Sequence, residues 1–151
     1  MQSSISDLEE ISENVFRNKS SFFIFDDFMR GFLIKKAQKS PHKRSRICLH
    51  KNNDEKTQNM IICLLENQKF SKHKHPINKN ESYTVIFGDL YVDIYNKKNC
   101  FENTIKLNKF NTPYMHKGGC IHQPYTRDSI TIYHEIFHGD FDRKVDMIEY
   151  S

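Results

Sequence analysis

The 151-residue chain contains no tryptophan, only five glycines and only four prolines, and its apolar residues never form a long run. The longest uninterrupted apolar stretch covers residues 60–65, whereas a membrane-spanning helix needs about 20 apolar residues. The first residues lack both the basic start and the apolar centre of a secretory signal. We therefore expect a cytoplasmic protein that does not insert into a membrane.

Cysteine is scarce as well, and charge of one sign does not dominate. The four cysteines lack the Cys-x-x-Cys spacing of a zinc knuckle, which indicates reduced thiols. The 23 basic and 19 acidic residues are interspersed except in the basic stretch 35–46. That stretch lacks the interleaved aromatic residues of a nucleic-acid-binding surface, so a solvated helix face is the favoured interpretation. We expect no nucleic-acid partner, while a small sugar-like or anionic substrate remains open.

The N-terminal part of the chain carries helical signals. A chain of this length is typical of one domain. A capping-box pattern and apolar residues at helical spacing predict a short helix over residues 6–15. Residues 22–25 form an apolar run suited to a strand, and Asp26 or Asp27 can cap a second helix that Pro41 ends.

The rest of the sequence predicts β-structure. Short extended runs follow one another at intervals of about ten residues, the pattern of an antiparallel sandwich or barrel. Gly88-Asp89 is suited to a two-residue hairpin turn. Two of the runs are apolar on both faces, so we expect the N-terminal helices or a second subunit of a homodimer to cover them. The runs are 47–50, 60–65, 70–75, 83–87, 90–95, 104–107, 120–122 and 130–137.

Three histidines and one carboxylate have the spacing of a metal site. His73 and His75 point to the same side of an extended strand, because side chains alternate with a period of two. Glu81 begins the next strand, and His122 follows a Gly-Gly turn. Such a mixed nitrogen and oxygen set predicts a divalent transition metal, namely Zn, Fe, Mn, Ni or Co. His116 is an alternative to Glu81 as a ligand.

Further residues are candidates for substrate chemistry. Glu135 lies in an otherwise apolar strand, and a buried carboxylate is costly unless it is paired. It is therefore either an acid or base near the metal or the partner of a nearby arginine. Glu135 and Tyr83 are the candidates for moving a proton. The candidate substrate-binding residues are Arg44, Arg46, His50 and Tyr133.

These motifs resemble a known family. The order His-x-His, five residues, Glu, six residues, Gly, and later Gly-x-x-His resembles the two metal motifs of the cupin superfamily. The flanks resemble the WbuC-type cupin metalloproteins and include Ser40-Pro41 with Arg44, Leu49-His50, Asp54-Glu55-Lys56 with Gln58, and Glu135 with Gly139 and Phe141. This resemblance covers roughly residues 22–141.

The resemblance implies a fold, a domain organisation and a function. The expected fold is mainly β: a cupin double-stranded β-helix, or jelly-roll barrel, with short N-terminal helices. We predict an N-terminal extension over 1–20, a cupin domain over 21–141 and a C-terminal tail over 142–151. WbuC-type proteins are commonly found with bacterial surface-polysaccharide (O-antigen) biosynthesis. This implies metal-dependent, isomerase-like or epimerase-like chemistry on a nucleotide sugar or sugar intermediate. A mononuclear non-haem iron dioxygenase and a non-catalytic sugar-binding module are the alternatives.

Overall fold

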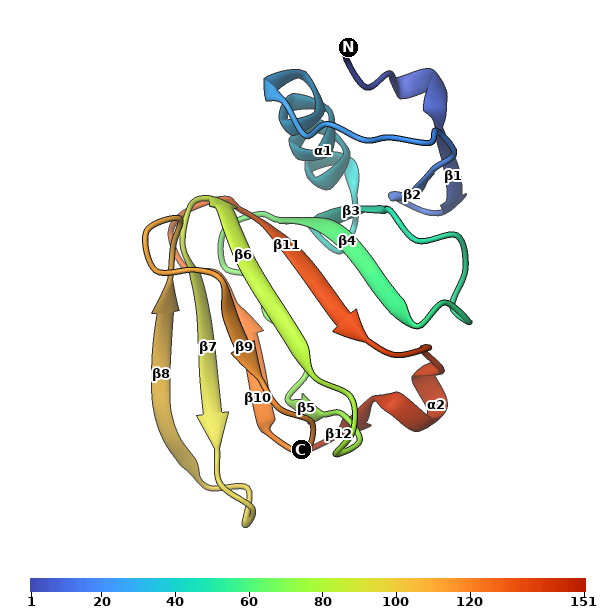
Figure 1. Cartoon of the computed structure of the whole chain (residues 1–151). Helices are drawn as coiled ribbons and strands as arrows, with labels where there is room; N and C mark the ends of the chain where they lie inside the picture. The colour runs from blue at the N-terminus through green and yellow to red at the C-terminus, as the bar shows by residue number, and fades with distance from the viewer.

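The computed structural model describes residues 1–151 and contains two facing β-sheets with one long helix outside the larger sheet (Figure 1). The larger sheet has the strand order β1-β2-β3-β4-β11-β6-β9, and the smaller sheet has the order β12-β5-β10-β7-β8. All strand pairs are antiparallel except β2 with β3. The predicted mainly-β jelly-roll architecture is therefore confirmed.

The regular elements follow one another along the chain in this order: 3₁₀ helix η1 (Ile5–Asp7), β1 (Leu8–Ser12), β2 (Val15–Asn18), α1 (Asp27–Lys39), β3 (Arg44–Cys48), β4 (Thr57–Leu64), β5 (His73–Lys74), β6 (Glu81–Phe87), β7 (Leu90–Tyr95), β8 (Phe101–Leu107), β9 (Tyr114–His116), β10 (Ile121–Tyr125), β11 (Thr131–His138), α2 (Arg143–Asp146) and β12 (Ile148–Glu149). Each of the eight extended runs predicted between residues 47 and 137 overlaps one of these strands. No helix is long and apolar enough to cross a bilayer.

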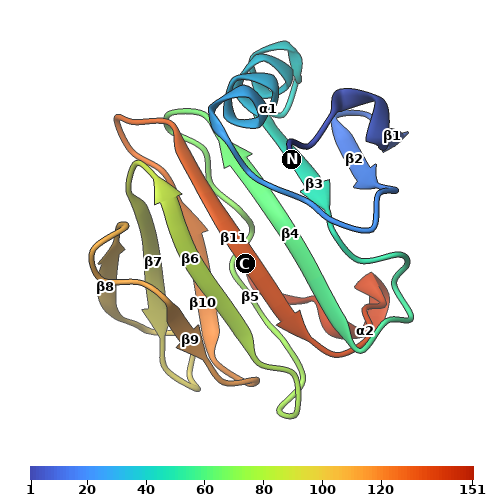
Figure 2. The same ribbon diagram turned by 45° about the horizontal axis from the view of Figure 1, so that its top comes forward.

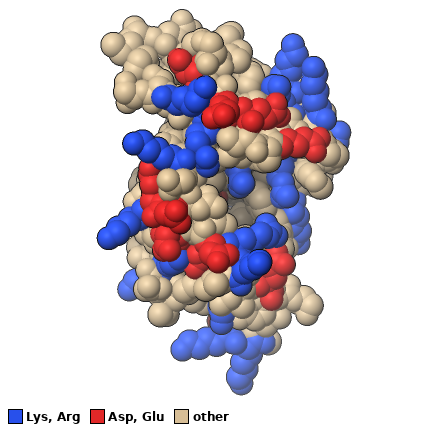
Figure 3. Space-filling model, turned by 90° about the vertical axis from the view of Figure 1, so that its right-hand side faces the viewer, with Lys and Arg blue, Asp and Glu red and all other residues tan.

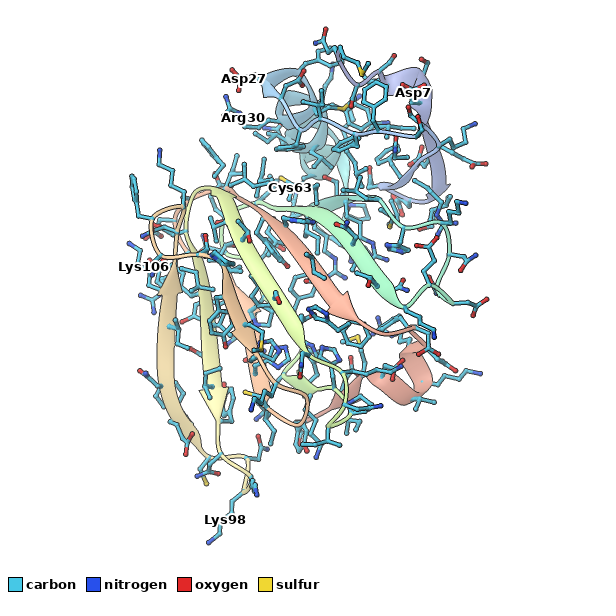
Figure 4. The ribbon with its side chains drawn as sticks, in the orientation of Figure 1. Asp7, Asp27, Arg30, Cys63, Lys98 and Lys106 are labelled. Carbon is cyan, nitrogen blue, oxygen red and sulfur yellow. The ribbon has the colours of Figure 1, made fainter.

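Helix α1 covers the outer face of the larger sheet (Figure 2). The side chain of Asp26 accepts a hydrogen bond from Met29 N at 3.0 Å and so caps the helix, as predicted. Met29, Leu33 and Ala37 form one buried stripe at i, i+4 spacing. This stripe packs in one cluster with Cys63, which Figure 4 shows beneath the helix. The doubly apolar strands β4 and β11 are thus covered from within the same chain.

A second core fills the space between the sheets. It contains Ile62, Leu64, Tyr83, Val85, Leu90, Val92, Leu107 and Tyr133. Strands β4 and β11 contribute alternate residues to this core and to the cluster under α1, because their side chains point alternately to the two faces. The inner face therefore carries the side chains that reach the interior of the jelly roll.

The N-terminal residues differ from the prediction. The helix expected over 6–15 is wrong, since only the short η1 is helical and the chain then forms the hairpin of β1 and β2. Asn14 adopts φ of 59°, and its N–H donates to the Glu10 side chain at 3.0 Å, which closes the turn. Phe16 is buried in the cluster under α1, so tertiary packing outweighs the local helical pattern. The strand expected over 22–25 is also wrong, because that segment forms no strand.

The turn at Gly88 also differs from the prediction. Its flanking strands β6 and β7 belong to different sheets, so the turn is a corner between the sheets and not a hairpin. Gly88 has φ of 75°, and a Cβ atom there would lie 2.1 Å from the backbone oxygen of Ile130. The turn at residues 96–99, by contrast, joins a paired hairpin of β7 with β8, and Figure 4 shows Lys98 at its tip. The corner therefore requires glycine for both its backbone angle and its space.

Replacing Gly88 by alanine should destabilise the fold. Left-handed backbone and the clash with a buried carbonyl together should lower the free energy of unfolding by about 2–4 kcal/mol. Urea denaturation measures this change. Gly31→Ala is the matched control: it lies within α1 with nothing within 4 Å of the added Cβ, so it should be neutral or stabilising by roughly 0.5–1 kcal/mol. Equal losses in the two variants would contradict the role of the corner.

The C-terminal residues are held firmly. β12 pairs with β5, with Ile148 opposite Lys74 and Glu149 opposite His73. Asp146 is buried, and its carboxylate contacts Lys79 Nζ at 2.9 Å. Residues 142–151, predicted as a C-terminal tail, thus contribute strand β12 to the smaller sheet, beside the residues predicted to bind metal.

Candidate metal centre

Five residues from both sheets converge between them. His73 lies on β5 and His122 on β10 of the smaller sheet, where the two residues are in register. His75 follows β5 directly. Glu81 begins β6 of the larger sheet and pairs with His116 on β9. The facing sheets therefore bring together all four predicted ligands and also the alternative, His116.

The separations are short and all five side chains are buried. The Nε2 atoms of His122, His116 and His75 lie 3.1, 3.2 and 3.4 Å from Glu81 Oε2. The ring centroid of His73 lies 4.3 Å from that of His122. One ligand atom from each of His73, His75, Glu81 and His122 falls within 4.8 Å of the others.

Backbone carbonyls fix the orientation of three imidazoles. Nδ1 of His73, His75 and His122 lies 2.8, 2.6 and 3.0 Å from the carbonyl oxygens of Ser71, Asp146 and Cys120, respectively. A neutral imidazole that donates from Nδ1 has its lone pair on Nε2. Such a contact at the remote nitrogen is the usual support of a metal-binding histidine.

Burial favours the neutral form of His73 and His122, and contacts with the histidines favour the charged form of Glu81. Burial lowers the pKa of His73 to about 4 and also lowers the pKa of His122. Burial would raise the pKa of Glu81, but hydrogen bonds from three histidines hold it well below its usual range. The pKa of His75 is raised: burial lowers it, but the contacts with Glu81 outweigh this effect. Neutral imidazoles around an ionised carboxylate are the protonation states that bind metal.

These residues fit a divalent transition metal. Nε2 lone pairs and a carboxylate oxygen are all acceptors, so they cannot satisfy one another without a proton or a cation between them. One proton on His75 would satisfy one contact, whereas a cation would satisfy all of them. Nε2 of His75 and Nε2 of His116 have Glu81 as their only polar contact, and Nδ1 of His116 is buried without a partner. His116 therefore lies beside Glu81 in the cluster, while the four residues whose ligand atoms fall within 4.8 Å of one another are His73, His75, Glu81 and His122.

Two residues proposed to move protons lie beside the cluster. The Tyr83 hydroxyl donates to Glu81 Oε2 at 2.6 Å, and burial raises the pKa of Tyr83 well above 10, so this group stays a donor. Glu135 is half-buried and lies opposite Tyr83 on the adjacent strand. Burial and the charge of Glu81 raise the pKa of Glu135 well above its usual range. Glu135 forms no ion pair with Arg44 or Arg46, so no salt bridge offsets this rise in its pKa.

A cavity of about 650 Å³ leads to the cluster. His73, His75 and Glu81 line it, as do the predicted residues Arg44, Arg46, His50, Tyr83 and Glu135. Tyr133 does not line it; the structure buries this side chain in the core beside Tyr83, with its hydroxyl unpartnered. Figure 3 shows one face of the molecule, where basic and acidic side chains surround a hollow.

Sequence reasoning missed three residues around the site. Arg17 lines the same cavity from β2, and its alternation with Val15 could have placed it on one face had the strand been predicted. Lys79 and Asp146 form the buried ion pair that holds the C-terminal residues against His75. No local signal marks these two, because they lie 67 residues apart in the sequence.

Solved structures with the same architecture are cupin-type proteins. A Klebsiella pneumoniae protein with a double-stranded β-helix domain aligns with a TM-score of 0.56 at 16% identity, covering 74% of this chain and 89% of that one. L-ribose isomerase of Cellulomonas parahominis gives 0.55 at 8%, covering 64% and 60%. A variant of Bacillus subtilis oxalate decarboxylase, an enzyme with Mn(II) centres, gives 0.52 at 15%, covering 62% of this chain. The chain spans only 24% of that enzyme's length.

These likenesses define the fold as a cupin-type double-stranded β-helix, and the buried histidine and glutamate cluster suits a metal. The sequence matches the family model described as a domain of unknown function (DUF6016) over residues 25–107, more than half of the chain. The chain therefore belongs to that family. A search of curated proteins gave no match.

Proposed function

We propose that this chain is a metal-dependent cupin enzyme that isomerises or epimerises a nucleotide sugar or a related sugar intermediate. The observation that carries the proposal is a buried cluster of histidines and Glu81 beside a cavity that a second carboxyl group, Glu135, also lines. A sugar isomerase is among the solved structures with a similar fold, so this fold is compatible with such chemistry. The resemblance to WbuC-type cupins supports a place in bacterial surface-polysaccharide biosynthesis.

The roles of the side chains follow from their positions. A divalent ion held by His73, His75, Glu81 and His122 would polarise a carbonyl or hydroxyl oxygen of the substrate. Isomerisation or epimerisation removes a proton from one atom of the substrate and returns a proton to another. Glu135 lies on the cavity wall and its pKa is raised, so its carboxylate would accept the first proton and its carboxylic acid would return it. Tyr83 orients Glu81 through its hydroxyl and remains the second candidate for moving a proton. His50 lines the same cavity and would contact the substrate.

Glu135→Gln tests the proposal most directly. The amide keeps the shape of the side chain but cannot transfer the proton, so turnover of nucleotide sugars should fall at least about 10²-fold. Metal content should stay unchanged, because the metal-facing atoms belong to other residues. Nuclear magnetic resonance of sugar conversion and elemental analysis measure the two quantities. Glu102→Gln, at an exposed position on β8, is the matched control and should leave both unchanged.

Two results would redirect the assignment. Iron in the purified protein together with substrate-dependent oxygen uptake would indicate the non-haem dioxygenase. Sugar binding without any conversion, retained in His73→Ala, would indicate the non-catalytic binding module. Full turnover by Glu135→Gln would remove that residue from the mechanism.

A further inference from the structure

Three arginines line one wall of the cavity without an acidic partner. Arg44 and Arg46 lie on β3, and Arg17 lies on the neighbouring β2. None of them forms an ion pair within 4.0 Å, whereas Arg30 and Arg143 do. An arginine without a carboxylate is ordinary on a convex surface, but three on the wall of one cavity require an explanation.

Strand register places the three side chains on the same face. Arg44 and Arg46 are two residues apart on β3, so they project to one side. β2 runs parallel to β3 with Val15 opposite Arg46, and Arg17 is two residues further along on that side. Arg44 and Arg46 are about 7 Å apart along β3, and Arg17 lies opposite Cys48, about 7 Å beyond Arg46. Arg46 is therefore the central member of the row, and the long side chains on either side can reach toward it. Three guanidinium groups can therefore converge on one ligand.

No acidic side chain pairs with this wall, and only Arg44 has an aromatic partner, with its guanidinium 5.0 Å from the centroid of the Phe70 ring. The pKa of Arg44 is lowered by burial and by repulsion from Arg46 and Arg143, and Nε of Arg17 is buried without a partner. Among the acids that line the cavity, Glu81 faces the histidines and Glu149 pairs with Arg143 at 3.3 Å. Glu135 forms no ion pair with any of the three arginines, and Glu13 is exposed and unpaired. A donor left unsatisfied in this way is costly until a ligand accepts from it.

We propose that Arg17, Arg44 and Arg46 bind a phosphate or diphosphate group of the substrate, which makes the substrate a phosphorylated small molecule. This assignment rests on the proposed function for the reaction at the metal cluster. A single carboxylate would neutralise only one of the three positive charges, whereas a phosphate or diphosphate group carries about two negative charges and several acceptor oxygens. The planar guanidinium fork also matches the geometry of phosphate oxygens.

Calorimetric titration of the full chain with inorganic pyrophosphate tests the inference. We expect binding by the metal-loaded protein and by protein stripped of metal, since the arginines bind without the ion. Arg46→Gln and Arg17→Gln should each weaken binding about 10-fold or more, as expected for one charge-assisted contact. Arg46→Lys should fall between wild type and Arg46→Gln, because lysine keeps the charge and loses the fork. Acetate should bind far more weakly than pyrophosphate.

The control and the contrary outcomes separate this inference from the proposed function. Arg127→Gln removes an exposed arginine that stacks on Tyr91 away from the cavity, so it should leave binding unchanged. Pyrophosphate binding that is absent, that disappears with the metal, or that ignores both arginine substitutions overturns the inference while the metal-dependent reaction stands. If the protein never takes up a metal but still binds pyrophosphate through its arginines, the result supports the inference and contradicts the proposed function.

Discussion

His122→Ala should purify without its metal. Wild-type protein prepared without added metal should contain roughly one divalent ion per chain, as for a site of four protein ligands. Binding by such sites is worth about 10–16 kcal/mol, which is about 3–4 kcal/mol per ligand, so the variant should bind about 10²–10³-fold more weakly. His122 is suited to this test because it is fully buried and its Nε2 lies 3.1 Å from Glu81 Oε2. Elemental analysis after dialysis and titration with Zn²⁺ or Mn²⁺ measure the loss.

His138→Ala is the matched control for this prediction. It lies at the exposed end of β11 and should keep the wild-type metal content. A chelator should reduce the turnover of wild-type protein to the level of His122→Ala, and added metal should restore only the wild type. Equal metal content in wild type and His122→Ala would show that the cluster is not a metal site.

The metal cluster was predictable because its signals are local in the sequence. Period-two alternation places His73 and His75 on one side, and each remaining ligand lies near the start of a strand that its own pattern indicates. A jelly roll brings the starts of these strands together, so the predicted fold and the predicted ligands are consistent with each other. His116 was the weaker candidate from the sequence, since the short strand β9 that presents it has little pattern of its own.

The parts that the sequence did not predict depend on long-range packing. The pattern of residues 6–15 fits a helix, but burial of Phe16 under α1 favours strands there. Without β2 as a strand, Arg17 could not be placed on the cavity wall. The sequence around Gly88 predicts a hairpin, because a glycine turn has the same local chemistry whether the chain stays in one sheet or passes to the other. Local propensity contains no information on that choice.

The C-terminal residues are the clearest case of such long-range dependence, and they bear directly on the metal. The carbonyl of Asp146 accepts from Nδ1 of His75 at 2.6 Å. β12 pairs with the strand that carries His73, and Tyr150 N donates to the carbonyl of Lys72 at 2.9 Å. Two of the four candidate ligands therefore depend on residues after 141: His75 through a direct hydrogen bond, and His73 through the pairing of its strand with β12.

Removal of residues 142–151 should consequently weaken metal binding by roughly 10²-fold or more. Loss of one supporting contact behind a metal ligand typically costs about 10–100-fold in affinity, and here both His73 and His75 lose support. The two sheets should still fold, because both core clusters lie outside this segment. Titration with Co²⁺, whose absorption spectrum reports ligand geometry, measures affinity and coordination together, and circular dichroism monitors the fold.

Point variants separate positioning from general destabilisation. Lys79→Met removes the cation that binds the buried carboxylate of Asp146 at 2.9 Å, so it should displace the Asp146 carbonyl and weaken Co²⁺ binding by about 10-fold. Lys144→Met makes the same change at an exposed position of α2 that forms no ion pair, and it should bind Co²⁺ like wild type. A truncated protein with an unaltered cobalt spectrum and affinity would mean that β5 orients both histidines unaided. In that case Ser71 alone would account for the position of His73, and the pairing with β12 would serve only to close the edge of the smaller sheet.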